Sequence, residues 1–419
     1  MLLWRVGQLL ARCGAPPAAA SAGGAPVRGR RGLAAAAAWG PTEVRRTAEP
    51  GRLVPPEELS FGADFTDHML TVQWKDGAWG APVVRPLEPF ALHPASPVLH
   101  YGMCCFEGMK AYHGADGRGR LFRPMLNMDR LATSMARLGF PAFDKAGLLE
   151  SIKVLLREDR RFLPERDDYS IYIRPFAFGC NPSLGVAPSS EVTLAVTLSP
   201  VGPYFKAGLT PVKIFLDESN VRAWAGGVGA FKMGGNYAPT IKPQVDAARE
   251  HGCAQVLYTL PRGAGDAAIS EVGAMNLFVL LRGADGALEL ATPALDGTIL
   301  PGVTRRSILE LAGGMDGVDG VAEREVTVSE LERASAAGDL VELFATGTAA
   351  IVQPVGSLQR ASGEVLVPSR EVGPEALSVR LFNRISDLQY GRERGEFEAW
   401  SEPFEGAEGE AAAEAAAGA

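Results

Sequence analysis

The sequence predicts an α+β fold of two mixed domains, and three observations support this prediction. Strand-like and helix-like segments both occur between about residues 60 and 395, but they do not alternate strictly as in a doubly wound sheet. The 419 residues are 47% hydrophobic and 21% charged, which suits a globular chain of two or three domains. Residues 199–208 (SPVGPYFKAG) are rich in Gly and Pro and are the expected domain boundary.

The first expected domain covers residues 60–200. Apolar residues at helical spacing predict helices over 129–138 and 145–159, and Gly139 suits the end of the first helix. Alternating or β-branched runs predict strands in three places, namely residues 68–74, 169–178 and 191–198.

The second expected domain covers residues 205–395. Residues 288–312 are expected to form a strand, a turn and the start of a helix. Ser329 and Glu332 have the spacing of a capping box, which predicts a helix that begins there and stops at Gly338. The other expected elements are a helix that ends near Gly252 and strands over residues 212–217, 254–260 and 276–282.

Charge and cysteine content exclude several classes of protein. The net charge is −8 and the body of the chain has no basic cluster, which argues against a nucleic-acid partner. The five cysteines are odd in number and irregular in spacing, so they predict neither a disulfide framework nor a zinc site. The histidines lack metal-ligand spacing, and we expect no metal. No apolar run reaches the ~18 residues of a transmembrane helix, so no membrane partner is expected.

The two ends of the chain differ in composition from its middle. Residues 1–42 contain five arginines, many alanines and no acidic residue, which is typical of an organellar transit peptide. We therefore predict that residues 1–45 are a transit peptide or disordered; the alternative is a basic tail without targeting information. Residues 400–419 are rich in Glu, Ala and Gly, which predicts a disordered acidic tail.

The most unusual stretch is residues 226–237 (GGVGAFKMGGNY), where Lys232 stands among five glycines. A P-loop needs a Gly-Lys pair, which the chain lacks, and Lys232 occupies the third glycine position of a GxGxxG fingerprint. A third possibility is a lysine that forms a Schiff base with pyridoxal 5'-phosphate (PLP), because a glycine-walled, water-poor site favours the uncharged amine. The alternative is a solvated lysine in a loose loop.

A PLP site makes two further demands. The pyridine nitrogen needs an acidic partner, and Glu271 precedes an apolar strand where an isolated carboxylate is costly to bury. The phosphate needs donors at a helix N-terminus, and residues 300–306 (LPGVTRR) supply them. The alternatives are a charged turn residue and an ordinary Pro-Gly turn.

At this point the chain resembles the branched-chain amino acid aminotransferases, which are fold-type IV PLP enzymes with the cofactor at the interface of two α/β domains. The resemblance covers about residues 60–390. The motifs that carry it are FTDHML, LHPASPVLHYG, FEGMKAY, LFRPMLNMDR, YIRPF with NPSLGVAP, AGGVGAFKMGGNYAPT, EVGAMNLF, ILPGVTR and TGTAAIVQPVG.

The resemblance implies a set of cofactor-binding residues. Lys232 is implied as the catalytic residue, which holds PLP covalently and moves the substrate proton. Tyr237 is implied to contact the phenolic oxygen of the cofactor, and Glu271 its pyridine nitrogen. The phosphate is implied to be held by Arg130 and the backbone of Val303 and Thr304, with the hydroxyls of Thr304 and Thr346 as further donors.

It also implies the substrates and the oligomeric state. Leucine, isoleucine or valine and 2-oxoglutarate are expected to give branched 2-oxo acids and glutamate. The implied side-chain pocket consists of Phe61, Tyr101, Phe106, Tyr172 and Arg174. Tyr172 and Arg174 occupy alternate strand positions, so they are expected to face one side; the alternative is that Tyr172 is a core aromatic and FEGMK an ordinary turn. The backbone amides of Thr348 and Ala349 are implied to bind the α-carboxylate. Tyr101, Leu184 and Val186 are implied to reach the partner's site in a homodimer.

Two positions depart from the animal members of the family. Ala350 and Gln353 stand where those members have a CxxC redox pair, and Ala274 stands where they often have Thr. These departures and the N-terminal segment favour a plant-like or algal-like member in a mitochondrion or chloroplast. The alternatives are a D-amino acid aminotransferase, an aminodeoxychorismate lyase or a catalytically silent paralogue.

Overall fold

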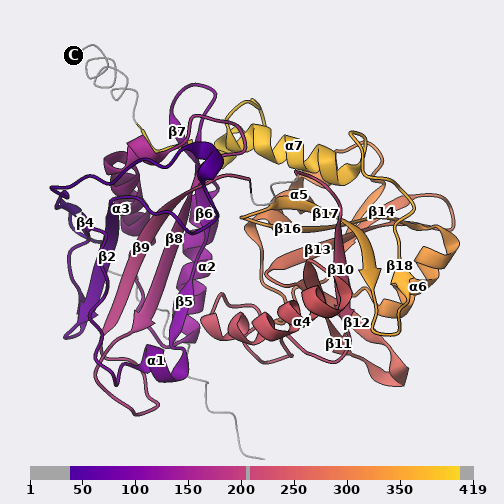
Figure 1. Ribbon diagram of the computed structural model, residues 1–419, viewed down its shortest axis with the longest axis horizontal. Coiled ribbons are helices and arrows are strands. Elements are labelled where there is room, and N and C mark those ends of the chain that lie inside the picture. Colours follow the sequence, from indigo (N-terminus) through magenta and orange to yellow (C-terminus); the bar gives the residue numbers. More distant parts are fainter. Residues whose placement is uncertain (1–37, 204–207, 406–419) are drawn as a thin grey trace, which may run out of the picture. The chain divides into compact units, whose positions relative to one another are not determined.

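The computed structural model describes residues 38–203 and 208–405, and residues 36–419 form one compact unit. The described residues build two β-sheets that follow one another along the chain (Figure 1). The predicted α+β class is confirmed, whereas the division into domains over 60–200 and 205–395 stays a prediction.

The first sheet has ten strands in the order β1-β4-β2-β9-β8-β6-β7-β19, with β3 beside β2 and β5 beside β8. Its strands pair antiparallel except for β1 and β4. Their bounds are β1 (Glu43–Val44), β2 (His68–Lys75), β3 (Ala78–Trp79), β4 (Val83–Pro86), β5 (Cys104–Phe106), β6 (Met109–His113), β7 (Gly119–Phe122), β8 (Ser170–Gly179), β9 (Val192–Val201) and β19 (Ser401–Pro403).

Helices α2 (Pro124–Arg137) and α3 (Lys145–Glu158) cover this sheet (Figure 1). Their apolar stripes form one buried core with strand residues such as Leu70, Ile171 and Leu194. α3 begins where Asp144 accepts a hydrogen bond from the Gly147 backbone N–H, a standard N-cap. The short helix α1 (Pro97–Tyr101) ends at Gly102, whose φ of 57° is left-handed.

The second sheet has nine strands in the order β12-β11-β10-β17-β16-β13-β14-β15, with β18 beside β17. β12 also pairs with β13, so the strands from β12 to β13 close into a ring. Their bounds are β10 (Val212–Asp217), β11 (Gln255–Pro261), β12 (Ala267–Val272), β13 (Met275–Arg282), β14 (Leu288–Thr292), β15 (Gly320–Glu323), β16 (Leu340–Gly347), β17 (Ile351–Gln359) and β18 (Val365–Leu366).

Four helices accompany the second sheet: α4 (Ile241–His251), α5 (Val303–Ala312), α6 (Val328–Ala337) and α7 (Leu377–Gln389). α5 and α7 share a buried core with β13, β14 and β16, in which the rings of Phe278 and Phe344 stack 5.3 Å apart. The buried carboxylate of Glu342 accepts hydrogen bonds from the backbone N–H groups of Leu377 and Ser378, which fixes the start of α7.

Two of the predicted element boundaries need correction. β9 continues to Val201, so the segment expected to be a linker at 199–208 begins inside a strand. The cap of α6 is Thr327, whose hydroxyl accepts from the Glu330 backbone N–H, because the hydroxyl of Ser329 instead donates to Asp266 at 2.6 Å. The other end of α6 is as predicted, since the helix stops at Gly338.

Both predicted terminal segments also extend too far into the fold. Within residues 1–45, β1 pairs with β4, and Trp39 packs against Trp79 at 5.9 Å. Within residues 400–419, β19 pairs with β7 and the buried ring of Phe404 joins the first core. Long-range pairing therefore orders segments whose composition alone predicts disorder. The rest of the transit-peptide and acidic-tail predictions lies outside the described residues.

Candidate active site

Lys232 follows β10 in the chain but is attached to the first sheet. Its backbone N–H donates to the hydroxyl of Ser134 on α2 at 2.9 Å, and its carbonyl accepts from the Phe106 N–H at 3.0 Å. The next residue, Met233, forms a β-bridge with Cys105. The lysine backbone is therefore fixed between the two halves of the chain and is no part of a loose loop.

The glycines around Lys232 are required by close contacts within the protein. A Cβ added at Gly229 would lie 2.3 Å from the carbonyl oxygen of Thr298, and one at Gly234 would lie 2.8 Å from the sulfur of Cys104. Only glycine allows the backbone to approach these atoms. The glycine pattern thus sets the position of the lysine between β5 and the loop before α5.

The amine of Lys232 lies in an aromatic environment. Its Nζ is 3.0 Å from the Tyr237 hydroxyl, and it lies 4.9 Å from the ring centroid of Phe106 and 5.1 Å from that of Tyr237. The two rings meet edge to face at 4.8 Å. An amine held beside a phenol in a half-buried site can exchange a proton and attack a carbonyl.

Glu271 lies near the end of β12, and a turn at Gly273 places Asn276 of β13 opposite it. The carboxylate accepts from the Asn276 amide at 2.8 Å and the Leu300 N–H at 3.3 Å, and it pairs with Arg222 at 2.5 Å. Burial raises the pKa of Glu271, while the charges of Arg222 and Lys232 oppose that shift. The lysine is thus close enough to act on this carboxylate electrostatically.

Arg130 and the start of α5 line one cavity of about 500 Å³. The guanidinium forms a two-pronged pair with Glu107 at 2.7 and 2.8 Å and donates to the Pro301 carbonyl at 3.1 Å. The first backbone N–H groups of α5, beginning at Val303, have no partner within the helix, so they can bind an anion.

The aromatic wall includes Phe61, Phe106, Tyr172 and Arg174. Arg174 donates to the Tyr172 hydroxyl at 3.2 Å, and its guanidinium lies 4.8 Å from the Phe106 ring, so both residues lie on one side of β8 as their spacing predicts. Phe61 meets Tyr172 edge to face at 4.9 Å. Gly108 allows the Tyr172 hydroxyl to lie against the backbone, because a Cβ there would be 1.9 Å from it.

The turn between β16 and β17 is tied to β6 and the residue before it. The Thr348 hydroxyl donates to the Gly108 carbonyl at 3.1 Å, and Lys110 Nζ donates to the Ala349 carbonyl at 2.8 Å. This turn, with Thr348 and Ala349, therefore lies beside the glycine that the Tyr172 hydroxyl contacts.

The remaining predicted residues are less directly connected. Thr304 is buried in the first turn of α5, and the Thr346 hydroxyl already donates to the Ile351 carbonyl at 2.6 Å. The Tyr101 hydroxyl donates to the Leu184 carbonyl at 2.5 Å. Leu184 and Val186 are 64% and 83% exposed in the single chain. Their expected contact with a partner's site stays a prediction.

Sequence reasoning missed Glu107, Arg222, Asn276 and Lys110. All four are buried, and each holds a residue that the motifs do indicate. Glu107 had a signal, since a carboxylate inside the apolar run CCFEGM is buried only with a partner. Arg222 lies 49 positions before its partner, and only the folded sheet brings the two together.

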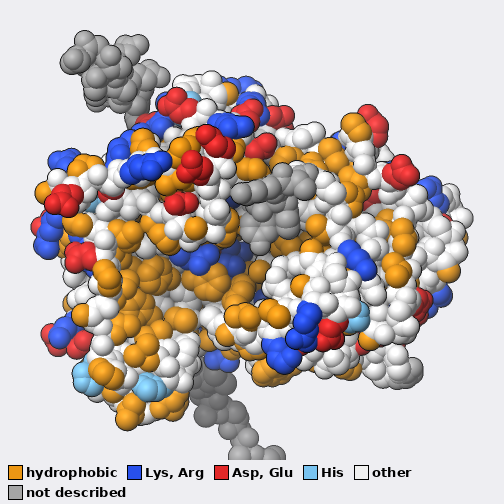
Figure 2. Space-filling view, viewed as in Figure 1, with side chains coloured by type: hydrophobic (Ala, Val, Ile, Leu, Met, Phe, Trp, Pro, Cys, Tyr) orange, Lys and Arg blue, Asp and Glu red, His pale blue; other side chains and the backbone are white. Residues whose placement is uncertain are grey.

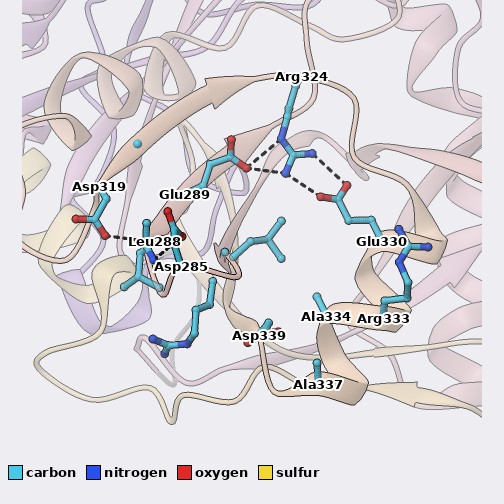
Figure 3. Close-up of a pocket in the computed structure, with 15 residues that line it drawn as sticks. Asp285, Leu288, Glu289, Asp319, Arg324, Glu330, Arg333, Ala334, Ala337 and Asp339 are labelled. Carbon is cyan, nitrogen blue, oxygen red and sulfur yellow. Dashed lines mark hydrogen bonds and ion pairs between the residues drawn. The ribbon is translucent and has the colours of Figure 1, made fainter.

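Another cavity, of about 590 Å³, lies between β13, β14 and α6 (Figure 3). Its Arg324 is already shared between Glu289 at 2.6 Å and Glu330 at 2.8 Å, so its charge is neutralised. Within residues 38–203 and 208–405, no group of His, Cys, Asp or Glu is arranged to hold a metal. No helix in these ranges is both long and apolar enough to cross a membrane.

Comparison with known proteins finds one family model and several relatives by sequence. The model of the family described as amino-transferase class IV matches residues 104–358. The cytosolic branched-chain-amino-acid aminotransferase of Mus musculus is 47% identical over 80% of this chain and 86% of its own length. The mitochondrial enzyme of Rattus norvegicus is 46% identical over 83% of this chain and 88% of its own.

Solved structures agree with the sequence comparisons. The Escherichia coli branched-chain amino acid aminotransferase is 26% identical, with a TM-score of 0.61 over 82% of this chain and all of its own. A bacterial-type relative of the same name, solved with pyridoxamine 5'-phosphate, is likewise 26% identical, with a TM-score of 0.62 over 80% of this chain and 98% of its own.

Proposed function

The chain belongs to the amino-transferase class IV family, and from this premise we propose that it transfers the amino group of leucine, isoleucine or valine to 2-oxoglutarate. The products are a branched-chain 2-oxo acid and glutamate. The observation that carries the proposal is the half-buried Lys232 amine beside Tyr237, within electrostatic reach of the buried Glu271 carboxylate.

We infer PLP as the cofactor because the donor groups match its three functional ends. Lys232 supplies an amine for the aldehyde, Glu271 a buried carboxylate for the ring nitrogen, and Arg130 with the α5 N-terminus a cationic site for the phosphate. The Asn276 side chain, bonded to both Glu271 and the Leu300 carbonyl, ties the last two sites together. When bound, PLP supplies the electron sink that makes the α-proton of an amino acid acidic.

Lys232 is the residue proposed to hold the cofactor and then to move the proton at the substrate Cα. Its backbone is fixed by Ser134 and Phe106, so its amine swings from a rigid base. The Tyr237 hydroxyl, 3.0 Å away, orients that amine. The Arg222 guanidinium favours the ionised form of Glu271, which an interaction with a protonated ring nitrogen requires.

The aromatic wall accounts for the proposed substrates. Phe61, Phe106 and Tyr172 offer an apolar surface for a branched side chain. Because an apolar pocket separates substrates that differ by one methylene by only about 1–3 kcal/mol, all three branched amino acids are expected to react. Arg174, which lies over this wall, offers a cation for the distal carboxylate of glutamate.

The turn at Thr348 and Ala349 is proposed to bind the α-carboxylate through its backbone amides. Thr348 and Ala349 are both held by β6 and its preceding residue, through the Gly108 carbonyl and Lys110. A turn fixed at both residues keeps its N–H groups oriented before the substrate arrives, which avoids an ordering cost on binding.

We also propose a homodimer and an organellar location. Leu184, Val186 and Tyr101 are exposed apolar groups on adjoining loops, and Figure 2 shows hydrophobic side chains gathered over α1 and the neighbouring strands. A partner's pocket is a suitable place to bury them. Among the relatives above, one is cytosolic and one mitochondrial, so a fusion of residues 1–60 to a fluorescent protein tests the location.

Glutamate formation by the purified, PLP-loaded protein tests the function. L-Leucine, L-isoleucine and L-valine with 2-oxoglutarate should each give glutamate, whereas D-leucine should not. Reaction with D-leucine alone would favour a D-amino acid aminotransferase, and no reaction with any of them would favour a silent paralogue.

A further inference from the structure

A separate cavity of about 250 Å³ lies behind the turn that carries Ala349. Lys110 and Tyr112 of β6, Ile351 of β17, and Phe382 and Ser386 of α7 are among its lining residues. Ala349 also lines it, so this one residue belongs both to the cavity and to the turn proposed to bind the α-carboxylate.

The cavity contains a buried cation that is only partly satisfied by the described residues. The Lys110 residue is 7% exposed, and one of its three N–H donors is used by the Ala349 carbonyl. Asp168 acts on its charge electrostatically, but the effect of burial is larger. Burial lowers the pKa of Lys110 to about 8, so its charged form is destabilised yet still predominates at neutral pH.

A second polar group in the cavity also has an unmet hydrogen-bonding capacity. The hydroxyl of Ser386 is buried and has no partner among the described residues, and the residue as a whole is only 8% exposed. Buried polar groups are normally hydrogen-bonded, so an orphan hydroxyl near a partly satisfied ammonium indicates a missing acceptor. An acceptor that also compensates the charge is an anion.

The rest of the lining selects the kind of anion. Leu209, Val352 and Phe382 provide apolar walls. Asp168 lies exposed on the lining and disfavours a second negative charge. A volume of about 250 Å³ is below the range of about 300–1,000 Å³ that holds drug-sized ligands. We propose that this cavity binds a small monocarboxylate with an apolar body, whose carboxylate is held by Lys110 and Ser386.

Binding there has a consequence for the site, which rests on the proposed function. The same ammonium that meets the ligand also holds the Ala349 carbonyl. A carboxylate that draws Lys110 away loosens this turn, so the KM for leucine rises while kcat changes little.

Counting bound probe molecules tests the second site directly. Calorimetric titration of the PLP-loaded enzyme with 4-methylpentanoate should give two molecules per chain, one at the substrate pocket and one in this cavity. Ser386→Leu fills the cavity and should reduce the count to one. Asn383→Leu, on the exposed side of the same helix, should keep two. Ser386→Val serves as a smaller replacement if the leucine variant does not fold.

The pH dependence gives a second readout. The weaker protonation of Lys110 above about pH 8 should reduce affinity for the second molecule between pH 7 and 9.5. The other ionisable lining groups do not titrate there, because burial raises the pKa of Tyr112 and of Tyr390, and Asp168 is a carboxylate. One molecule per chain in the wild type, or two in a folded Ser386→Leu variant, would overturn the proposal. Loss of leucine turnover with the count intact would instead count against the proposed function.

Discussion

Replacing Glu107 should strongly destabilise the fold, because this carboxylate is wholly buried and compensates a buried arginine. It accepts two hydrogen bonds from Arg130, one from Asn127 at 2.9 Å and one from the Gly108 N–H at 3.1 Å. Removing one partner of a buried ion pair typically costs about 3–5 kcal/mol, since the other charge stays buried alone. Glu107→Leu and Glu107→Gln should each lower the free energy of unfolding by about that amount.

Guanidinium-induced unfolding, followed by tryptophan fluorescence at pH 7, measures this loss. The double variant Glu107→Leu/Arg130→Leu should recover much of it, because no unpaired charge remains. Asp246→Asn, which breaks an exposed pair with Lys242, should leave the midpoint unchanged. If Glu107→Gln unfolds at the wild-type midpoint, or if the double variant is no more stable than Glu107→Leu, the reasoning about the buried pair is refuted.

The same pair predicts the direction of a pH effect. Burial would raise the pKa of Glu107, but the Arg130 guanidinium outweighs it and holds the pKa below its usual value. A carboxylate with a lowered pKa stabilises the folded state above its unfolded pKa of about 4.3, and that contribution is lost as pH falls through the lower folded value. The stability difference between wild type and Glu107→Gln should therefore shrink below about pH 4.

Three further predictions concern the cofactor, the N-terminus and the thiols. Glu271→Gln should keep PLP bound but slow single-turnover conversion of leucine, and an unchanged rate would mean that Glu271 is not the ring partner. Removing residues 1–37 should leave the melting temperature unchanged, whereas removing 1–45 should lower it through loss of β1 and the Trp39 contacts; equal melting temperatures would contradict this. Mild peroxide should spare leucine turnover, because burial raises the pKa of the Cys104 and Cys105 thiols. A loss that dithiothreitol reverses, and that Cys104→Ser/Cys105→Ser abolishes, would reveal thiol control.

Local sequence patterns predicted individual elements well. The apolar periodicity of residues 145–159 predicted α3 to within one residue, and the β-branched run at 212–217 is β10. Both depend on contacts made by a continuous segment, and so they leave a mark in the local sequence.

Contacts between distant segments were not predictable in the same way. β19 joins β7 from the far end of the chain, and the low-complexity composition after it concealed the strand. The motifs indicated Lys232, Arg130 and Glu271 as site residues, but not the partners Glu107 and Arg222, whose positions depend on the folded sheets. The glycines of residues 226–237 were recognised as unusual, but their cause, packing against Thr298 and Cys104, required coordinates.

The central claim is that Lys232 is the amine that holds PLP and moves the substrate proton. The most direct test is a single-turnover reaction of the PLP-loaded Lys232→Ala variant with L-leucine, with the visible absorbance of the protein recorded before mixing. The wild type should show a visible band from the lysine-bound cofactor and form the 2-oxo acid. The variant should lack that band and form no product without an added amine, and near-normal product formation by the variant would contradict the claim.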